Sequence, residues 1–316
     1  MTEKAVSLFA GPGGLDLGSE AAGVSTVGIE VDAGAVATRL AAGLATVHDD
    51  VRRYGPADFP EARVVTAGPP CQTFTVAGRG EGRLALTQLV RRAKFMAARE
   101  SLPGSVLDER SLLVLEPLRW ILEAIDLGDP YRAVVLEQVP QALPMWQTYA
   151  DLLRAEGYAV ACGLLRTEQY EVAQTRKRAV LLARFGAGDV TLPAPTRGKW
   201  SRTRRDPELP AALSMGEVLD RDTPFTVISN YGTGGDPRNR GRRHSTEPAF
   251  TVTGKVSRNR VVDADEGELP RFSHSEAGVL QSFPADFPWT GSDIAQQIGN
   301  ACPPRLGRAL VEAVAR

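Results

Sequence analysis

The sequence predicts an α/β fold: a doubly wound, mostly parallel sheet accompanied by a smaller, irregular, β-containing domain. Short apolar runs of β-like composition alternate with helix-like stretches as far as Phe185, which is typical of βαβ units. A glycine-rich turn, Gly11-Pro12-Gly13-Gly14, joins the first apolar run to the first helical stretch. Beyond Phe185 the long helical patterns stop, and Pro, Gly, Arg and Thr become frequent.

The predicted elements follow one another in regular order. Strands are expected at Val6–Ala10, Thr26–Ile29, Ala62–Ala67, Ala133–Leu136, Ala159–Leu165 and Ala179–Ala183. Helices are expected at Leu15–Ala22, Ala33–Ala42, Leu112–Ile125, Trp146–Glu156 and Pro304–Ala315. Because the carboxyl ends of parallel strands share one edge of a sheet, we expect a ligand site at that edge.

The same pattern divides the chain into two domains. Residues 1–185 together with 293–316 are expected to form the sheet domain, and residues 186–292 the second domain, which we call the small domain. A chain of 316 residues is long enough to bury a large core and a smaller one.

Charge is unevenly distributed although the net charge is only −1. Residues 197–260 hold 13 Lys and Arg against 7 Asp and Glu, and residues 76–110 hold 7 against 4. An acidic body that carries two basic segments fits a polyanionic partner such as nucleic acid. For each segment alone, a solvated arginine-rich loop is the alternative.

Composition argues against several other classes of protein. No apolar run reaches the roughly 18 residues of a membrane span, and the N-terminal residues lack the layout of a signal peptide. Cys71, Cys162 and Cys302 lie far apart, and the three histidines are scattered. We therefore expect no metal site, no disulfide framework and a cytoplasmic setting.

The glycine-rich turn is the first candidate site. Glycines between a strand and a helix let the backbone approach a ligand and expose the amides of the helix N-terminus. Glu30 ends the second predicted strand, where a carboxylate would meet ribose hydroxyl groups, and Asp50 is placed to accept from an adenine amino group. These residues predict a nucleoside cofactor; a tight turn with solvated acids is the alternative.

Cys71 is the candidate nucleophile. It follows the predicted strand Ala62–Ala67 and the rigid segment Gly68-Pro69-Pro70, whose prolines fix φ just before the thiol. A thiol presented at a strand end is positioned for covalent chemistry. A buried, unreactive cysteine is the alternative, because free cysteines are commonly core residues.

Glu137 is the candidate acid that would act with this thiol. It ends the predicted strand Ala133–Leu136, so it should face the same edge of the sheet as Cys71. In an extended Gln174–Arg178 segment, Gln174, Arg176 and Arg178 would share a face, where arginine can hold a carboxylate or a substrate carbonyl. A surface strand is the alternative for that segment.

The order of these motifs resembles that of the DNA (cytosine-5) methyltransferases over nearly the whole chain. The matching segments are Phe9–Gly14, Gly68–Gln72 with Val76–Gly78, Glu137–Val139, Gln174–Arg178, Leu280–Pro284 and Gln297–Ala301. The resemblance implies a class I methyltransferase fold, S-adenosylmethionine as cofactor and a flipped-out cytosine of double-stranded DNA as substrate. It further implies that Cys71 adds to C6 of the base while Glu137 protonates N3, and that C5 receives the methyl group.

The resemblance also assigns roles by position. The catalytic residues would be Cys71, Glu137, Arg176 and Arg178, with Arg178 touching the base and Arg176 supporting Glu137. The cofactor contacts would be Phe9, Gly11, Gly13, Glu30, Val31, Asp50, Val51, Pro70, Leu113, Asn300 and Ala301. The small domain would recognise the target, and the DNA contacts would be Gln72, Thr75, Arg79, Arg238, Arg240, Arg242, Arg243 and Lys255.

Three features depart from the family pattern. Gln138 stands where the family usually has Asn, and Cys302, which we interpret as a packing residue, follows the last motif. An insert of roughly Arg83–Val106 looks helical and basic. We interpret it as a surface helix, with added DNA contacts or gating of closure as the alternative.

Three other functions remain as alternatives: an RNA cytosine-5 methyltransferase, a catalytically silent DNA-binding relative, and a nicotinamide dehydrogenase. The basic small domain favours duplex DNA, the intact motifs argue against a silent relative, and Pro70-Cys71 has no purpose in a dehydrogenase. We expect a monomer, associated with the nucleoid of a prokaryote or expressed in a phage host. A cognate restriction endonuclease is a candidate partner.

Overall fold

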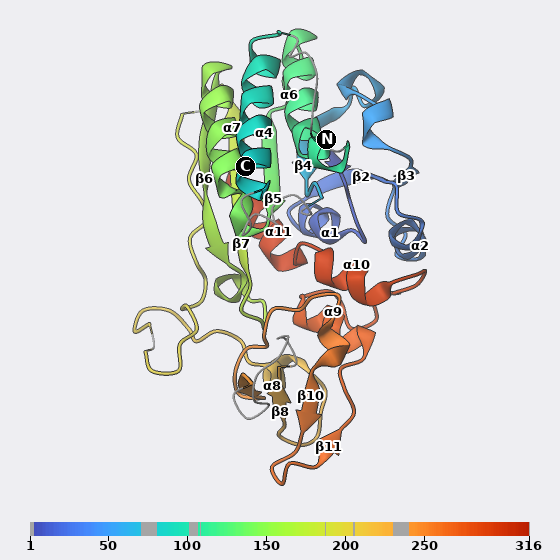
Figure 1. Ribbon diagram of the computed structural model, residues 1–316, viewed down its shortest axis with the longest axis vertical. Helices are drawn as coiled ribbons and strands as arrows, with labels where there is room; N and C mark the ends of the chain where they lie inside the picture. The colour runs from blue at the N-terminus through green and yellow to red at the C-terminus, as the bar shows by residue number, and fades with distance from the viewer. Residues whose placement is uncertain are drawn as a thin grey trace.

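A seven-stranded sheet forms the centre of the molecule in the computed structural model (Figure 1). The structure describes residues 3–70, 81–100, 107, 109–186, 188–204, 206–229 and 240–315. The strand order is β3-β2-β1-β4-β5-β7-β6; the first five strands are parallel, and β7 runs antiparallel to both β5 and β6. The predicted doubly wound, mostly parallel sheet is confirmed.

The elements follow the predicted order, and several of their bounds differ from the predicted ones by two or three residues. The strands of the large sheet are β1 (Glu3–Leu8), β2 (Val24–Glu30), β3 (Thr46–His48), β4 (Ala62–Ala67), β5 (Ala133–Gln138), β6 (Tyr158–Arg166) and β7 (Lys177–Phe185). Its helices are α1 (Gly14–Ala21), α2 (Ala33–Ala41), α4 (Glu81–Ala97), α5 (Glu109–Leu112), α6 (Glu116–Asp126), α7 (Leu143–Ala155), α10 (Ile294–Asn300) and α11 (Pro304–Ala315). None of the described helices is long and apolar enough to cross a membrane.

Alternate residues of each strand supply two separate cores. On β5, Val134 and Leu136 face the core that α4, α6 and α7 cover, whereas Ala133 and Val135 face the core that α11 covers. Figure 1 shows α4, α6 and α7 side by side on their face of the sheet. This two-sided burial explains why the strands read as nearly continuous apolar runs.

The predicted helix Leu112–Ile125 is divided in the structure. A short helix, α5, passes into a 3-10 turn at Leu113–Leu115 before α6 begins. Pro117 lies in the first turn of α6, where a missing N–H costs nothing but a continuous helix would lose a hydrogen bond.

Helix α4, which overlaps most of the basic insert, packs one face against the core, while its other described residues stay partly or fully exposed. Leu89 and Ala93 are fully buried among the residues of α6 and α7. Just beyond the helix, Arg99 forms ion pairs with Asp126 and Glu156, at the ends of α6 and α7. The apolar stripe and these ion pairs dock the insert onto the sheet domain.

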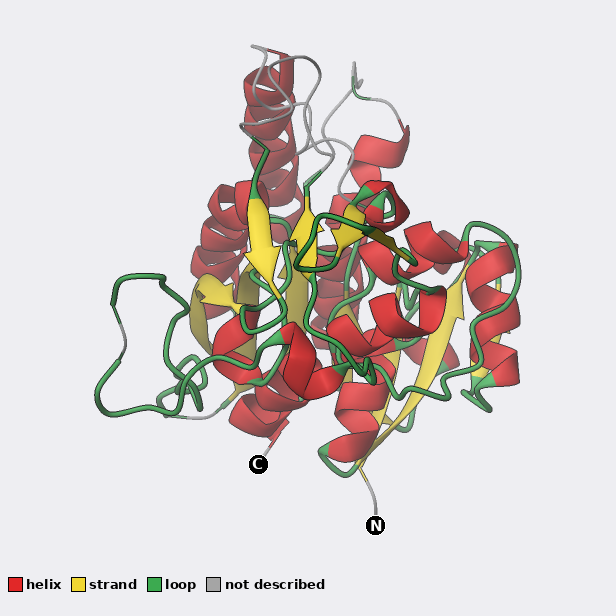
Figure 2. Cartoon of the chain, turned by 90° about the horizontal axis from the view of Figure 1, so that it is seen from below, coloured by secondary structure: helices red, strands yellow, loops and turns green. Residues whose placement is uncertain are grey.

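The small domain is built around a second sheet, which is antiparallel and four-stranded (Figure 2). Its order is β11-β10-β8-β9, with β8 (Thr226–Ile228), β9 (Arg242–His244), β10 (Arg260–Val262) and β11 (Glu268–Leu269). The short helices α8 (Met215–Val218) and α9 (His274–Leu280) complete it. Its apolar core includes Phe225, Phe272 and Leu280, and also Ile298 of α10, which therefore connects the two parts of the molecule.

Candidate active site

A crevice of about 580 Å³ lies at the carboxyl ends of β1, β2, β4 and β5. This is the edge at which open α/β sheets bind their ligands. The predicted cofactor residues that line it are Phe9, Gly11, Glu30, Val31, Asp50, Val51, Pro70, Leu113, Asn300 and Ala301. Glu137, Arg176 and Arg178 line the same crevice, so the two predicted sites form one cavity.

The glycine-rich turn lines this crevice and has an unusual backbone conformation. Phe9 and Gly11 both have positive φ, 55° and 53°, which is unusual for a residue with a side chain such as Phe9. The Gly11 amide donates to Glu30 Oε2 at 2.7 Å, and the amides of Val31 and Asp32 donate to Glu30 Oε1, both at 2.8 Å. Glu30 thus fixes the turn to the end of β2. A strained aromatic residue at a ligand edge is typical of a functional site.

Acidic side chains gather at the far end of the crevice. Asp49 and Asp50 line it together with Glu30. Hydrogen bonds from Arg52 hold the pKa of Asp50 below its ordinary value, although partial burial opposes this effect. Asp50 is therefore a carboxylate acceptor at neutral pH. Arg52 pairs with Asp50 and Arg53 with Asp49, so these two acids are already partly neutralised by the protein.

Gly13 lies outside the lining of this crevice, in contrast to the expectation that it contacts the cofactor. It is the N-cap of α1 with φ 102°, and a Cβ at this position would lie 2.2 Å from Leu44 Cδ1. Gly13 therefore serves the packing behind the turn, where only a residue without a side chain fits.

Glu137 and Arg178 form an ion pair at the other end of the crevice. Arg178 Nε lies 2.5 Å from Glu137 Oε1, and the two side chains are 11% and 7% exposed. Among the described residues, Oε1 receives no aligned hydrogen bond, so the contact is ionic in character. Arg178 thus takes the position beside the acid that the sequence analysis assigned to Arg176.

Arg176 is directed instead toward main-chain carbonyls of the small domain and of α10. Its Nη1 donates to the Val252 carbonyl at 2.8 Å, and its Nη2 donates to the carbonyls of Gly299 at 2.8 Å and Ala301 at 3.3 Å. Gln174, two residues earlier, is fully buried; its side-chain Nε2 donates to Gln281 Oε1 at 2.7 Å, and its Oε1 accepts from the Val252 backbone amide at 2.8 Å. These buried bonds join the lead-in to β7 to the small domain.

Gln138, the departure from the family pattern, has a defined partner. Its side-chain amide donates to the Pro69 carbonyl, and its Oε1 accepts from the Val139 amide. The end of β5 is thereby bound to the Pro69-Pro70 segment that follows β4. Cys71, Gln72, Thr75 and Arg79, which come next in the sequence, lie outside the described residues, as does Arg238.

The four described candidates for DNA contact fall into two groups. Arg242 and Lys255 are exposed and Arg240 is half-buried; Arg242 forms an ion pair with Glu266. Arg243, however, is buried, and its guanidinium carbon lies 3.5 Å from the centre of the Trp200 ring. Because Arg243 also donates to the Pro248 carbonyl at 3.1 Å, we correct its assignment from DNA contact to packing.

Several lining residues were missed from the sequence. Thr251, Thr253 and Gly254 of the small domain and Gln296 of α10 close one wall of the crevice. No periodic pattern marks them, because they belong to loops and to a helix end. Their proximity to Gln297–Ala301, one of the segments that carried the resemblance, is the signal that could have identified Gln296.

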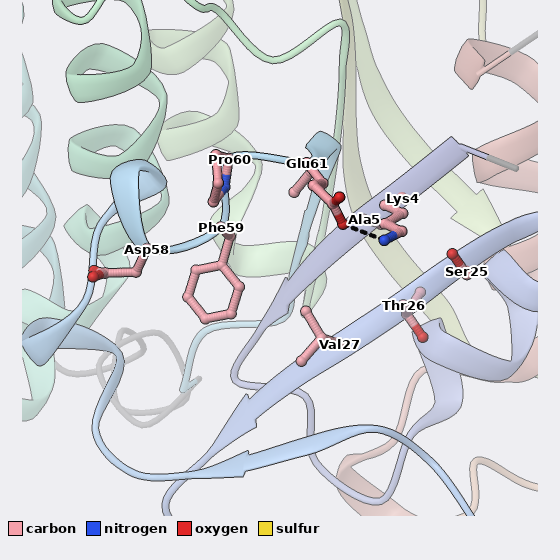
Figure 3. A pocket seen from close by; sticks show the side chains of 10 residues that line it. Lys4, Ala5, Ser25, Thr26, Val27, Asp58, Phe59, Pro60 and Glu61 are labelled. Atoms are coloured by element: carbon pink, nitrogen blue, oxygen red, sulfur yellow. Dashed lines mark hydrogen bonds and ion pairs between the residues drawn. The ribbon is translucent and has the colours of Figure 1, made fainter. Parts of the chain in front are cut away.

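A second hollow, of about 500 Å³, lies at the opposite edge of the sheet (Figure 3). Lys4 and Ser25 at the amino ends of β1 and β2 face Phe59 and Glu61 across it, and Lys4 forms an ion pair with Glu61. Amino ends of parallel strands are not the usual place for a ligand, so this hollow enters no part of the candidate site.

The strand order, the antiparallel last pair and the crevice at the carboxyl edge define a class I, S-adenosylmethionine-dependent methyltransferase fold. Solved structures share it. Schizosaccharomyces pombe Dnmt2 methyltransferase has a TM-score of 0.64 at 17% identity, over 98% of this chain and 97% of that one. Entamoeba histolytica methyltransferase EhMeth has a TM-score of 0.64 at 12% identity, over 99% and 98%. At these identities the likeness concerns the fold.

Sequence comparisons also find methyltransferases. Residues 4–89 match the family described as C-5 cytosine-specific DNA methylase. The Type II methyltransferase M1.HphI of Haemophilus parahaemolyticus is 28% identical over 98% of this chain and 86% of its own length. M.NlaX of Neisseria lactamica is 28% identical over 98% and 95%. These findings support the DNA (cytosine-5) methyltransferase family: its model matches residues 4–89, and Type II methyltransferases are similar along almost the whole chain.

Proposed function

We propose that this enzyme transfers a methyl group from S-adenosylmethionine to carbon 5 of a flipped-out cytosine in a specific duplex DNA sequence, through a covalent bond between Cys71 and C6. One observation carries the proposal. A single crevice is lined by the nucleoside-type turn, by Glu137 with Arg178, and by Pro70, the residue directly before Cys71 in the sequence. Cofactor, acid and nucleophile would therefore meet in one cavity.

The residues of the crevice suit S-adenosylmethionine. Glu30 would bind ribose hydroxyl groups, Asp50 would accept from an adenine amino group, and the apolar Phe9, Val31 and Val51 would enclose the ring. When bound, the cofactor supplies an electrophilic methyl group. Asn300 and Ala301 would contact its amino-acid portion from the other wall.

The protein's own groups would then activate carbon 5 of the base. The Cys71 thiolate adds to C6, and Glu137 donates a proton to N3, so that the electron pair displaced by the addition is held at C5 as an enamine. C5 would take the methyl group from the sulfonium, leaving S-adenosylhomocysteine as the other product. Loss of the C5 proton to a base, departure of Cys71 from C6 as a thiolate and return of the N3 proton to Glu137 would then give 5-methylcytosine. Arg178, which pairs with Glu137, would orient this acid and would also contact the base.

Recognition of the target is assigned to the small domain. A stacked base cannot reach this crevice, so the cytosine must leave the duplex. The domain division at residues 186 and 293 is part of the proposal, and it is supported by the separate antiparallel sheet and its own core. Arg240, Arg242 and Lys255 are proposed as contacts to phosphate or base edges. Because the relatives are Type II methyltransferases, we propose a role in restriction-modification, beside a cognate endonuclease.

Trapping on a fluorinated substrate tests the proposal. The protein is incubated with S-adenosylmethionine and a random-sequence duplex library that contains 5-fluoro-2′-deoxycytidine, and denaturation-resistant adducts are isolated and sequenced. A base can remove a proton from C5 but not a fluorine, so Cys71 cannot be eliminated and its bond to C6 persists. The sequences of the trapped DNA then reveal the recognition sequence.

Matched cysteine variants locate the bond. We expect adducts for the natural protein and for Cys302→Ser, and none for Cys71→Ser. A parallel arm uses RNA that contains 5-fluorocytidine. Adducts on RNA alone would overturn the DNA assignment, and no adduct on either substrate would overturn the covalent mechanism.

A further inference from the structure

A fully buried ion pair lies directly beneath the glycine-rich turn. Asp16 on α1 and Arg39 on α2 have side chains with no solvent exposure, and Arg39 Nη2 lies 2.7 Å from Asp16 Oδ1. Ser7 on β1 donates to the other oxygen, Asp16 Oδ2, at 3.2 Å. Removing two charged groups from water costs free energy, and a buried ion pair often stabilises a protein no more than an apolar pair of the same size would. Stability alone therefore does not explain why these two residues are charged.

The remaining donors of Arg39 connect the turn to its neighbours. Nη1 reaches the Ala10 carbonyl at 3.5 Å, Nη2 donates to the Ala45 carbonyl at 3.1 Å, and Nε donates to Thr46 Oγ1 at 3.0 Å. The Ala10 carbonyl also accepts from the Gly13 amide at 3.1 Å, the bond that closes the turn. One planar guanidinium thus contacts the turn, α1 and the start of β3, a geometry that an ammonium group cannot reproduce.

Gly28 leaves the space that the guanidinium occupies. A Cβ at Gly28 would lie 2.0 Å from Arg39 Nη2 and 2.7 Å from Ala10 Cβ. Gly28 is on β2, two residues before Glu30, whose carboxylate holds the Gly11 amide on the crevice side. The turn is therefore held from both sides, by Glu30 in the crevice and by Arg39 behind it.

We propose that Asp16 and Arg39 are positioning residues for the cofactor turn. They set the backbone of Ala10–Gly13 relative to Glu30, and so determine affinity for an S-adenosyl nucleoside without touching it. This inference rests on the proposed function, since it takes the crevice as the S-adenosylmethionine site. It assigns the pair to cofactor binding, and leaves the chemistry at Glu137 unaffected once cofactor is saturating.

The test separates positioning from general stability. In the double variant Asp16→Leu/Arg39→Met, an apolar pair replaces the charges, so folding is retained while the Ala10 and Ala45 carbonyls lose their donor. Binding of S-adenosylhomocysteine is measured by calorimetry, and methyl transfer is measured as KM for the cofactor and kcat. We expect Kd and KM to rise at least tenfold, and kcat to stay within threefold.

Two further variants keep the test decisive. Gly28→Ala retains both charged residues and displaces the guanidinium, so it should raise Kd in the same direction. Leu153→Ala, in the core of α7 on the other face of the sheet, lowers the melting temperature and should leave Kd within twofold.

Each outcome has one meaning. The inference would be overturned if the folded double variant or folded Gly28→Ala bound S-adenosylhomocysteine as tightly as the natural protein. It would also be overturned if Leu153→Ala lost as much affinity as these variants. Failure of the natural protein to bind S-adenosylhomocysteine or S-adenosylmethionine would count against the proposed function instead.

Discussion

Arg178 Nε lies 2.5 Å from Glu137 Oε1 within the crevice, and this contact separates the two arginines of the Gln174–Arg178 segment by function. Arg178 holds the acid, whereas Arg176 holds carbonyls of Val252, Gly299 and Ala301. The residues are two apart in an extended segment, so their side chains start from the same face. Their different partners predict different phenotypes.

Replacing Arg178 with Met should mainly affect turnover. The variant leaves Glu137 without its cation, so the acid loses its orientation toward the base, and we expect kcat to fall at least tenfold, or about 1.4 kcal/mol. Arg176→Lys should mainly lower the free energy of unfolding, by about 2 kcal/mol, because buried carbonyls lose their donors. Kinetics and urea denaturation measure the two effects. A variant of Arg178 that keeps more than half of natural turnover would contradict this division of roles.

Arg243 and Arg242 are neighbours in sequence with opposite expected effects. Burial lowers the pKa of the Arg243 guanidinium, yet its stacking on Trp200 and its bond to the Pro248 carbonyl retain the charge in the small domain. We expect Arg243→Ala to destabilise the protein by about 2–4 kcal/mol. Arg242→Ala should change stability by less than about 0.5 kcal/mol and weaken DNA binding.

Denaturation together with DNA titrations over a range of salt concentrations measures both arginine effects. The expected signature of Arg242→Ala is a smaller dependence of affinity on salt, because one phosphate contact is lost. An unstable Arg242→Ala, or a stable Arg243→Ala that loses only DNA affinity, would reverse the two assignments.

Acid should weaken the attachment of α9. Burial raises the pKa of Glu276, but bonds from Arg221, at 2.5 Å and 3.0 Å, and from the Ser273 amide outweigh it, so the net shift is downward. A carboxyl group with a lowered pKa stabilises the folded state above its ordinary value of 4.5, and this contribution is lost as the pH falls through the lower folded-state value.

Glu276→Gln measures this contribution. We expect the variant to be about 1 kcal/mol less stable than the natural protein at pH 7, since it loses the ion pair and the charge of the capping box. The difference should shrink progressively below pH 4.5. Chemical denaturation at a series of pH values gives the comparison. A difference that stays constant with pH would show that the carboxylate charge is not responsible.

Cys302 should be inert in the native protein. Burial, with a smaller contribution from the nearby Glu137 carboxylate, raises the pKa of this thiol well above its ordinary value. Because the thiolate is the reactive form, iodoacetamide at pH 8 should leave Cys302 unmodified until the protein unfolds. Peptide mass spectrometry locates the label. Modification of Cys302 before unfolding would contradict the buried assignment.

The sequence alone was sufficient to predict the large sheet and the edge of that sheet at which the crevice forms. Strand signals such as Ala62–Ala67 and Ala133–Gln138 are strong because both faces are buried, and glycine and acidic residues at strand ends marked the crevice. The short β3 was not predicted, since three residues, two of them half-buried and one exposed, carry little periodicity. Helix α4 was predicted correctly, but its burial was not, because it depends on the packing partners α6 and α7.

Residue roles within the site were harder to predict, since motif spacing does not show which partner a long side chain reaches. Gly13 belongs to the cofactor turn by position, yet the space that its Cβ would need is filled by Leu44. Arg243 lies in a basic segment, yet it stacks on Trp200, 43 residues earlier in the chain. Thr251 and Thr253 reach the crevice only because Arg176 and Gln174 hold Val252 between them against the sheet domain.

Nucleoside analysis of treated DNA tests the central claim most directly. Unmethylated bacterial DNA is incubated with the protein and S-adenosylmethionine, digested to nucleosides and examined by mass spectrometry. We predict 5-methyl-2′-deoxycytidine with the natural protein, and a loss of at least 100-fold with Glu137→Gln, which preserves shape but removes the acid. Methylation at an exocyclic nitrogen of cytosine or adenine, or methylation of RNA with none of DNA, would contradict the account.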